Sequence, residues 1–271
     1  MKFSLLMSIY HKEKAEYFNR CMKSIWDEQT IKPSEIILVK DGSLTNELDE
    51  AIDKWKEYLG DIFKVIPLEK NLGLGEALNI GLKHCSFELV ARMDTDDIAV
   101  PNRFQKQLEV FKNKSKMDIC SSWVGEFEDN EKEIISYRKV PKTHQEIAKF
   151  AKRRNPLNHP AVMYKKSSVL NAGGYLSMLW FEDYYLWVRM LLNDSKFHNI
   201  QEPLVMMRAG YGQLQRRSGR DYLIAEFNFL KKLYEIGFLN KKEFIENLFL
   251  RAIVRVLPKN LIKLIYKKLR G

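Results

Sequence analysis

Cysteine is scarce in this chain, and the three residues that occur form no recognisable pattern. Cys21, Cys85 and Cys120 are odd in number, and no two of them share the C-x-x-C spacing. This count and spacing argue against a disulfide framework and against a zinc site. We therefore expect three buried thiols in a reducing cytosol.

Long hydrophobic runs and repetitive sequence are also missing. No apolar run reaches the about 18 residues from which a transmembrane helix is predicted. Residues 1–7 are largely apolar but lack a small-residue cleavage site, so we expect no signal peptide. The chain has no internal repeat or long linker. Its 271 residues, 45% of them apolar, are enough for one large domain or one domain with an appendage.

Strand and helix patterns alternate through the first 115 residues. The expected strands are 3–9, 35–39, 62–68 and 87–93, and the expected helices are 13–28, 48–59, 73–84 and 101–113. Such alternation predicts a parallel sheet in an α/β fold. The later pattern is mixed, with strands expected at 119–127, 134–140 and 203–208, helices at 143–152 and 181–192, and only helices from residue 217 onwards.

The most informative motif follows the fourth expected strand and reads Asp94-Thr95-Asp96-Asp97. Three carboxylates so close together repel one another unless a cation shares them. Mg²⁺ or Mn²⁺ accepts one or two carboxylates and completes its shell with water and phosphate oxygens. Open α/β sheets bind ligands at the carboxyl ends of their strands. The motif therefore indicates a metal held against a phosphorylated substrate, and the alternative is a solvated acidic turn.

Further motifs stand in a fixed order around these aspartates. They are Ser8-Ile9-Tyr10, V-K-D-G-S at 39–43, N-L-G-L-G-E-A-L-N-I-G at 71–81, A-R-M-D-T-D-D at 91–97, N-H-P at 158–160 and F-E-D-Y-Y-L-W at 181–187. In this order they resemble a family 2 glycosyltransferase of the GT-A fold, over most of residues 3–210. Within that family, the resemblance is to bacterial enzymes that build O-antigen or capsule repeat units.

The resemblance implies a fold and a domain division. The GT-A fold is an α/β fold with a Rossmann-like, mostly parallel nucleotide-binding sheet and a mixed acceptor-side region. We expect a glycosyltransferase domain in residues 1–210, divided into a nucleotide-sugar half (1–115) and an acceptor half (116–210). Residues 211–271 are expected to add basic amphipathic helices that associate with a membrane.

The resemblance also implies a reaction. It is an inverting transfer of a hexose, glucose or galactose, from a UDP-sugar with the help of Mn²⁺ or Mg²⁺. The implied acceptor is a lipid-linked saccharide, GlcNAc-diphosphate-undecaprenol, joined by a β-1,3 linkage in O-antigen or surface polysaccharide biosynthesis. Such an enzyme would be cytoplasmic and peripherally attached to the inner face of the plasma membrane.

The resemblance assigns roles to the aspartates, whose first three residues match a D-x-D motif. Asp96 would be the direct metal ligand. Asp94 would hold the metal through a water or orient the ribose, and Asp97 would support the metal shell or contact the donor sugar. The ion would neutralise charge on the departing nucleotide.

Five residues of the first half are further candidates for binding the nucleotide-sugar. Ser8 and Tyr10 end the first strand, where the ring would pack on the nucleobase or be a half-buried aromatic. Asp41 would accept the uracil imide N–H, although Asp-Gly is also an ordinary turn signal. Lys70 and Asn71 would contact ribose or diphosphate.

Glu182 and Asp183 begin a helix pattern that is rich in aromatic residues. Apolar rings raise the pKa of a carboxyl group towards that of a useful base. The alternative is an ordinary acidic residue that the helix dipole stabilises. We predict that Asp183 is the catalytic base, with Glu182 as the alternate. Trp180 and the neighbouring rings would stack on the acceptor sugar or pack in the core.

His159 and three arginines are candidates for positioning the acceptor or a diphosphate. A lone histidine is more often a core residue, but His159 lies within one of the matching motifs. Arg208, Arg216 and Arg217 flank a glycine-containing loop, and the guanidinium group matches phosphate geometry. A solvated basic loop is the alternative for the arginines. Asn79 is equally a candidate for a structural hydrogen bond within the fold.

Positive charge gathers at the end of the chain. Residues 241–271 contain nine Lys or Arg and two Glu, a net charge of +7 out of +10 for the chain. Apolar residues recur among them at helical spacing, which is typical of helices at anionic membrane surfaces. The alternative is that these helices pack on the domain and expose solubilising lysines.

Two other classes of protein remain as alternatives. A nucleotidyltransferase shares an acidic metal site, but it would usually carry a glycine-rich basic loop after the first strand, and Ser8-Ile9-Tyr10 does not begin one. A non-catalytic basic protein that binds membrane or nucleic acid has no need of clustered aspartates, which repel phosphate. We therefore expect no nucleic-acid partner.

Overall fold

The computed structural model describes residues 1–209 and 220–256, with side chains up to residue 251. Arg216, Arg217 and the basic residues beyond 256 lie outside the described residues, so their expected roles stay predictions. No helix in the described part of the chain is long and apolar enough to cross a membrane.

Four parallel strands form the first half of the sheet, in the order β3-β2-β1-β4. Their bounds are β1 Phe3–Ile9, β2 Glu35–Lys40, β3 Phe63–Pro67 and β4 Leu89–Arg92. Each is a short apolar run bounded by polar residues, as buried parallel strands are. The alternation expected from the sequence is confirmed.

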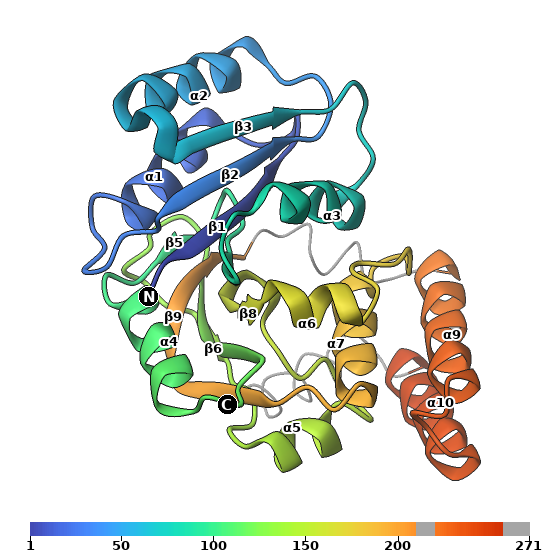
Figure 1. Cartoon of the computed structure of the whole chain (residues 1–271). Helices are drawn as coiled ribbons and strands as arrows, with labels where there is room; N and C mark the ends of the chain where they lie inside the picture. Colours follow the sequence, from blue (N-terminus) through green and yellow to red (C-terminus); the bar gives the residue numbers. More distant parts are fainter. Residues whose placement is uncertain (210–219, 257–271) are drawn as a thin grey trace.

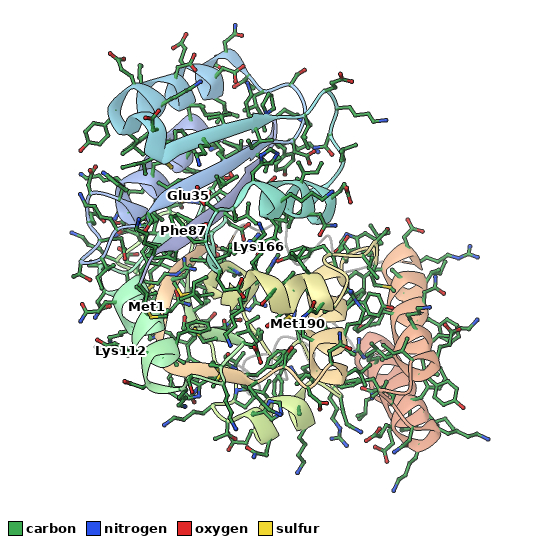
Figure 2. All side chains as sticks on the ribbon, viewed as in Figure 1. Met1, Glu35, Phe87, Lys112, Lys166 and Met190 are labelled. Atoms are coloured by element: carbon green, nitrogen blue, oxygen red, sulfur yellow. The ribbon has the colours of Figure 1, made fainter. Side chains whose placement is uncertain are left out.

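Helices cover both faces of this sheet (Figure 1). On one face lie α1 (Ala15–Ile25), α2 (Asn46–Leu59) and α4 (Arg103–Asn113), whose apolar residues share a core cluster with Phe3 and Leu5 of β1. On the other face lie α3 (Leu74–His84), α6 (Lys166–Asn171) and α7 (Glu182–Leu192). Met190 of α7 lies inside that second core cluster (Figure 2).

The second half extends the same sheet with mixed strand directions. β8 (Met163–Lys165) runs antiparallel to both β4 and β6 (Ile119–Phe127), and β6 runs parallel to β9 (Phe197–Arg208). β5 (Ile98–Ala99) and β7 (Ser136–Arg138) add short antiparallel pairs. The remaining elements are α5 (His144–Phe150) and the 3-10 turns η1 (Gly60–Ile62) and η2 (His159–Ala161). A parallel first half of the sheet followed by a mixed second half matches the expected GT-A architecture.

The last strand is longer than the sequence pattern predicts. The strand expected at 203–208 is the end of β9, which begins at Phe197 and contains Pro203. The ladder between β6 and β9 shifts register at Trp123, which pairs with Pro203. Proline cannot donate a ladder hydrogen bond, so it is tolerated in a strand at such an irregularity.

Two C-terminal helices complete the described part of the structure, and the first of them packs on α7. α9 (Arg220–Glu235) and α10 (Lys241–Val256) lie beside it in Figure 1, and a third core cluster joins α7 to α9. The ring of Phe229 in α9 stacks on Phe181 with a centroid distance of 4.6 Å. Lys152 pairs with Glu243 at 2.6 Å. The expected C-terminal helices are therefore present, and part of their surface packs on the domain.

Candidate active site

The candidate residues of the first half gather at one edge of the sheet. Tyr10 follows β1, Asp41 follows β2 and Asp94 follows β4 closely, and these three strands are parallel neighbours. Their carboxyl ends therefore meet at the edge where open α/β sheets bind ligands. The sequence prediction that these residues share one site is consistent with this topology.

A buried arginine holds Asp94. Both terminal nitrogens of Arg92 donate to the two carboxylate oxygens of Asp94, one of them at 2.7 Å. The Arg92 side chain is 1% exposed, whereas the Asp94 side chain is 34% exposed. Arg103 supports this fork because its Nη2 donates to the Arg92 carbonyl at 2.6 Å. Asp94 is thus fixed in direction and still open to a ligand, and a planar guanidinium is suited to such two-point contact.

Asp96 lies in a field of negative charge. Burial and the neighbouring carboxylates of Asp94 and Glu13 raise the pKa of Asp96 to about 7. Glu13 accepts a hydrogen bond from the Thr95 hydroxyl at 3.0 Å, and burial raises the pKa of its carboxyl group too. Repulsion of this kind is relieved by a shared cation. Glu13 was not among the site residues predicted from the sequence, although an acidic residue shortly after β1 could have been recognised as a candidate.

The donor set fits a divalent ion that keeps external ligands. Among the described residues no three His, Cys, Asp or Glu side chains are placed to hold a metal ion by themselves. Mg²⁺ and Mn²⁺ are commonly held by one or two carboxylates together with water and substrate phosphates. Asp96, with Asp94 beside it, can supply those carboxylates.

Asp97 has a supporting position. Its side chain is 1% exposed, and its Oδ1 accepts the backbone N–H of Arg208 at 3.0 Å. Burial, with the charges of Asp96 and Asp94, raises its pKa well above the usual range. Asp97 thereby ties the aspartate motif to the end of β9. Its expected contact with the donor sugar stays a prediction.

Arg208 lies where the aspartate motif meets the end of β9, and its side chain already contacts other residues of the protein. Its guanidinium lies 3.8 Å from the ring centroid of Tyr17 and 4.7 Å from that of Phe127. Its Nη1 donates to the Glu128 carbonyl at 3.2 Å. The positive charge of Arg208 acts on Glu13, so it balances part of the acidic cluster. Contact with a diphosphate stays a prediction.

The loop that precedes α3 is shaped by Asp41. The Asp41 carboxylate accepts the backbone N–H groups of Leu72 at 2.7 Å and Gly73 at 3.1 Å. Gly42 has φ +85°, and a Cβ there would come within 2.8 Å of the Asn71 backbone nitrogen. The turn after β2 and the loop before α3 therefore pack directly together. Asp41 has a structural role here, and its expected contact with uracil stays a prediction.

The remaining donor-side candidates differ in exposure. Tyr10 is 39% exposed at the end of β1, so its ring can meet a ligand. Lys70 and Asn71 are exposed, and Asn71 donates to the Asp41 carbonyl at 3.2 Å. Ser8 is half-buried within β1 opposite Val39. Tyr10, Lys70 and Asn71 can thus contact a nucleotide without rearrangement of the core.

Asp183 lies in the first turn of α7, in the half that is expected to bind the acceptor. Its Oδ2 accepts the Asn155 amide N–H at 2.7 Å, and its Oδ1 accepts the Tyr184 backbone N–H at 2.7 Å. Burial raises the pKa of Asp183, while the two hydrogen bonds and the positive charges of Arg92 and Arg138 lower it in part. A held carboxylate with a raised pKa is suited to accept a proton.

Glu182 faces a different neighbour. Its Cγ lies 3.6 Å from the position that a Cβ on Gly75 of α3 would occupy, so its side chain lies against the nucleotide half. Burial raises its pKa as well. Trp180 precedes these carboxylates with φ +66°, which is unusual for a bulky residue, and its ring lies 5.3 Å from that of Tyr222. Trp180 is 40% exposed, so its ring can contact an acceptor.

His159 belongs to a buried polar group. Its Nε2 lies 2.9 Å from the Tyr175 hydroxyl, and its ring lies 5.9 Å from that of Trp187. Burial and the charge of Arg92 hold its pKa well below the usual range, so the imidazole is neutral. The Asn79 amide holds Tyr175 by accepting its N–H at 2.8 Å and donating to its C=O at 2.7 Å. The structural role considered for Asn79 is thereby observed.

The comparisons with known proteins agree with this geometry. The family model "Glycosyl transferase family 2" matches residues 4–171. The chain is 41% identical over 267 residues to the UDP-Gal:alpha-D-GlcNAc-diphosphoundecaprenol beta-1,3-galactosyltransferase of Escherichia coli, covering 98% of this chain and 96% of that protein. It is 35% identical over 269 residues to the amylovoran biosynthesis glycosyltransferase AmsE of Erwinia amylovora, with 98% of each covered.

Solved structures agree on the fold. The S. aureus TarS 1-349 complex with UDP-GlcNAc superposes with a TM-score of 0.68 at 17% identity, covering 92% of this chain and 70% of that one. The mannosyltransferase PcManGT of Pyrobaculum calidifontis, in complex with GDP-Man and Mn²⁺, gives a TM-score of 0.64 at 14% identity, covering 93% and 69%. The nucleotidyltransferase and non-catalytic alternatives are set aside, because the chain is a glycosyltransferase of family 2 with the GT-A fold.

Proposed function

We propose that this glycosyltransferase moves a hexose from a UDP-sugar to a lipid-linked diphosphate saccharide, with inversion at the anomeric carbon. Galactose is the first candidate and glucose the second. The acceptor is GlcNAc-diphosphate-undecaprenol, and the product is a β-1,3 linkage in a surface polysaccharide such as O-antigen. The 41% identity to the Escherichia coli UDP-Gal:alpha-D-GlcNAc-diphosphoundecaprenol beta-1,3-galactosyltransferase supports this choice.

The observation that supports the mechanism is that the charge of one buried arginine acts on two carboxylates that are held differently. Arg92 pairs directly with Asp94, and its charge also acts on Asp183. The charge of Arg92 therefore acts on both the acidic motif and the candidate base. In this arrangement the donor diphosphate is met by the aspartate motif and the acceptor hydroxyl by Asp183.

On the donor side, Asp96 and Asp94 would hold Mn²⁺ or Mg²⁺. When bound, the ion supplies positive charge that stabilises the departing UDP diphosphate. Tyr10 would pack on the uracil ring, with Ser8 and Asp41 beside it, and Lys70 and Asn71 would contact ribose or diphosphate. Ser8, Tyr10 and Asp41 lie at the carboxyl ends of β1 and β2, and the exposed Lys70 and Asn71 lie in the loop after β3, which supports this division.

On the acceptor side, Asp183 takes the proton of the attacking hydroxyl group. The acceptor oxygen forms a bond to the anomeric carbon as the bond from that carbon to the diphosphate oxygen breaks, and the electron pair leaves with UDP. Hydrogen bonds from Asn155 and from the Tyr184 backbone fix the carboxylate, and each of its oxygens keeps a lone pair that can accept the proton. His159, held neutral beside Tyr175, would position the sugar.

We further propose that the enzyme acts while attached peripherally to the inner face of the plasma membrane, where the lipid-linked acceptor lies. The net charge of +7 in residues 241–271 supports attraction to anionic lipid. No nucleic-acid partner is proposed.

The proposal is tested with UDP-galactose, UDP-glucose and a GlcNAc-diphosphate-lipid acceptor in the presence of Mn²⁺. Asp183→Asn keeps the size of the side chain but cannot take the proton, so kcat should fall at least about 10²-fold. UDP affinity, measured by calorimetry, should change little because the group acts on the acceptor. Asp53→Asn on the exposed side of α2 is the matched control and should be fully active. If Glu182→Gln is crippled and Asp183→Asn is near normal, the base is the other carboxylate.

A further inference from the structure

Two helices at the end of the described chain leave an apolar face in solvent. Five large side chains on them are between 43% and 66% exposed, and we call them the α9–α10 outer face: Leu223, Phe227, Tyr234, Ile245 and Phe249. Scattered exposed apolar residues are ordinary, but a contiguous group marks an interaction surface.

The exposed residues of the two helices form one surface. The ring of Phe244 in α10 lies 6.4 Å from that of Phe227 and 5.4 Å from that of Tyr234, both in α9. Within α9, residues 223, 227 and 234 are four and seven positions apart, and in α10 residues 245 and 249 are four apart. Such spacing places each set on one side of its helix. The α9 residues of the outer face therefore reach the line where the helices meet, and Ile245 follows Phe244 there.

The outer face is distinct from the side by which the helices join the domain. α9 faces α7 with Ala225, Phe229 and Leu233, which are at most 9% exposed. α10 is tied down by Asn247, whose amide donates to the Lys152 carbonyl at 3.0 Å, and by an ion pair between Arg251 and Glu226. Each helix is thus held to the rest of the chain on one side, and the outer face lies on another, exposed side.

We infer that the α9–α10 outer face is the surface that docks on an anionic lipid bilayer. This inference rests on the proposed lipid-linked acceptor and names the surface that meets the lipid. A helix with one apolar side and basic neighbours lies in the membrane interface with its apolar side inserted.

Charge favours a bilayer over a second copy of the chain. Residues 257–271, which follow α10 directly, contain five Lys or Arg and no Asp or Glu. Two such faces brought together would also bring together two sets of positive charge, which repel. Anionic lipid would instead attract them, by about 1 kcal/mol for each basic residue near the surface.

The position of this face also suits the proposed acceptor. α9 separates the outer face from Phe181, which stacks on Phe229 at 4.6 Å and stands next to Glu182 and Asp183. Docking through the outer face would therefore bring the bilayer to the acceptor side of the molecule, one helix away from the candidate base. A lipid-linked sugar could then reach Asp183 while its lipid stays in the membrane.

The test is co-sedimentation of the full chain with vesicles that contain phosphatidylglycerol, and with vesicles of phosphatidylcholine alone. We expect the double variant Phe227→Ser with Phe249→Ser to lower the partition coefficient on anionic vesicles at least about tenfold, because two large apolar side chains no longer insert. The double variant Ile135→Ser with Leu170→Ser is the matched control. Those residues are 57% and 48% exposed on other elements, and binding should be unchanged.

Three results would overturn the inference. One is unchanged sedimentation of the Phe227→Ser, Phe249→Ser variant. Another is equal binding of the parent to both kinds of vesicle. The third is a parent dimer in light scattering that the same variant converts to a monomer, which would make the face an interface between copies. Transfer to a short, soluble acceptor should persist in the variant, and a parent that cannot perform it would disprove the proposed function while leaving the docking result standing.

Discussion

The two ends of the candidate active site hold their carboxylates in different ways. At the donor end, Asp94 is locked by a two-point ion pair with the buried Arg92. At the acceptor end, Asp183 is held by the neutral N–H groups of Asn155 and Tyr184, and burial raises its pKa. For Asp183, burial raises the pKa more than the two neutral N–H donors lower it, whereas Asp94 lies against a full positive charge. The difference fits a metal and diphosphate at one end and proton transfer at the other.

The largest expected effect concerns the donor end. Asp96→Ala removes the proposed direct ligand of a divalent ion that stabilises the leaving group by several kcal/mol, so kcat should fall about 10³-fold. In the parent, chelation should abolish transfer, and added Mn²⁺ should restore it. Full turnover in chelator without added metal would disprove the metal assignment.

Removing the arginine that both ends share should be costly for folding. Arg92→Met leaves Asp94 without its partner, and breaking a buried pair destabilises a protein by roughly 3–5 kcal/mol. Asp94 is 34% exposed and can be hydrated, so we expect the lower end, about 3 kcal/mol, in urea unfolding. Lys14→Met, which removes a cation that is 60% exposed in its ion pair, is the control and should cost far less. Equal losses of unfolding free energy in the two variants would mean that the ion pair between Arg92 and Asp94 does not anchor the aspartate motif.

The pH dependence of kcat/KM tests how Asp183 is held. A base must be deprotonated to act, so kcat/KM should fall as the pH drops through the raised pKa of Asp183. Asn155→Leu removes a hydrogen bond that lowers this pKa, so the acidic limb of the profile should move to higher pH. A limb that stays in place or moves to lower pH would contradict the role of Asn155.

The smallest effect on chemistry is expected in the tail. Replacing Lys259, Lys263, Lys267 and Lys268 with Gln leaves the apolar residues and the active site unaltered. Binding to anionic vesicles should weaken, and the residual binding should depend less on salt. Transfer to a short, soluble acceptor should be unaffected. Unchanged vesicle binding would show that this charge is a solvated surface.

Local patterns predicted the donor end better than the acceptor end. The acidic motif follows an apolar strand directly, and the alternation of strands and helices places it at a ligand-binding edge. Arg92 was overlooked because it lies inside an apolar strand, where its pairing with Asp94 is not visible as a pattern. Asn155 and Asp183 are 28 positions apart, and Asn79 and Tyr175 are 96 apart. Such contacts exist only once the sheet has assembled.

Short strands were missed for a related reason. β5 and β8 have two and three residues, and β8 is defined by its pairing with β4 and β6 rather than by its own composition. β9 was shortened in the prediction because Pro203 normally interrupts a strand. The aromatic residues of α7 allowed either a sugar platform or a core, and the stacking of Phe181 on Phe229 assigns that ring to the core.

The account depends most on single displacement with Asp183 as base, and the configuration of the product tests it directly. The measurement is the coupling of the anomeric proton in the product formed from a UDP-α-hexose and the GlcNAc-diphosphate-lipid acceptor. We predict the large coupling of a β-glycoside. The small coupling of an α-glycoside would contradict the mechanism. A single displacement inverts the anomeric carbon, so a product that retains the α configuration must form in another way.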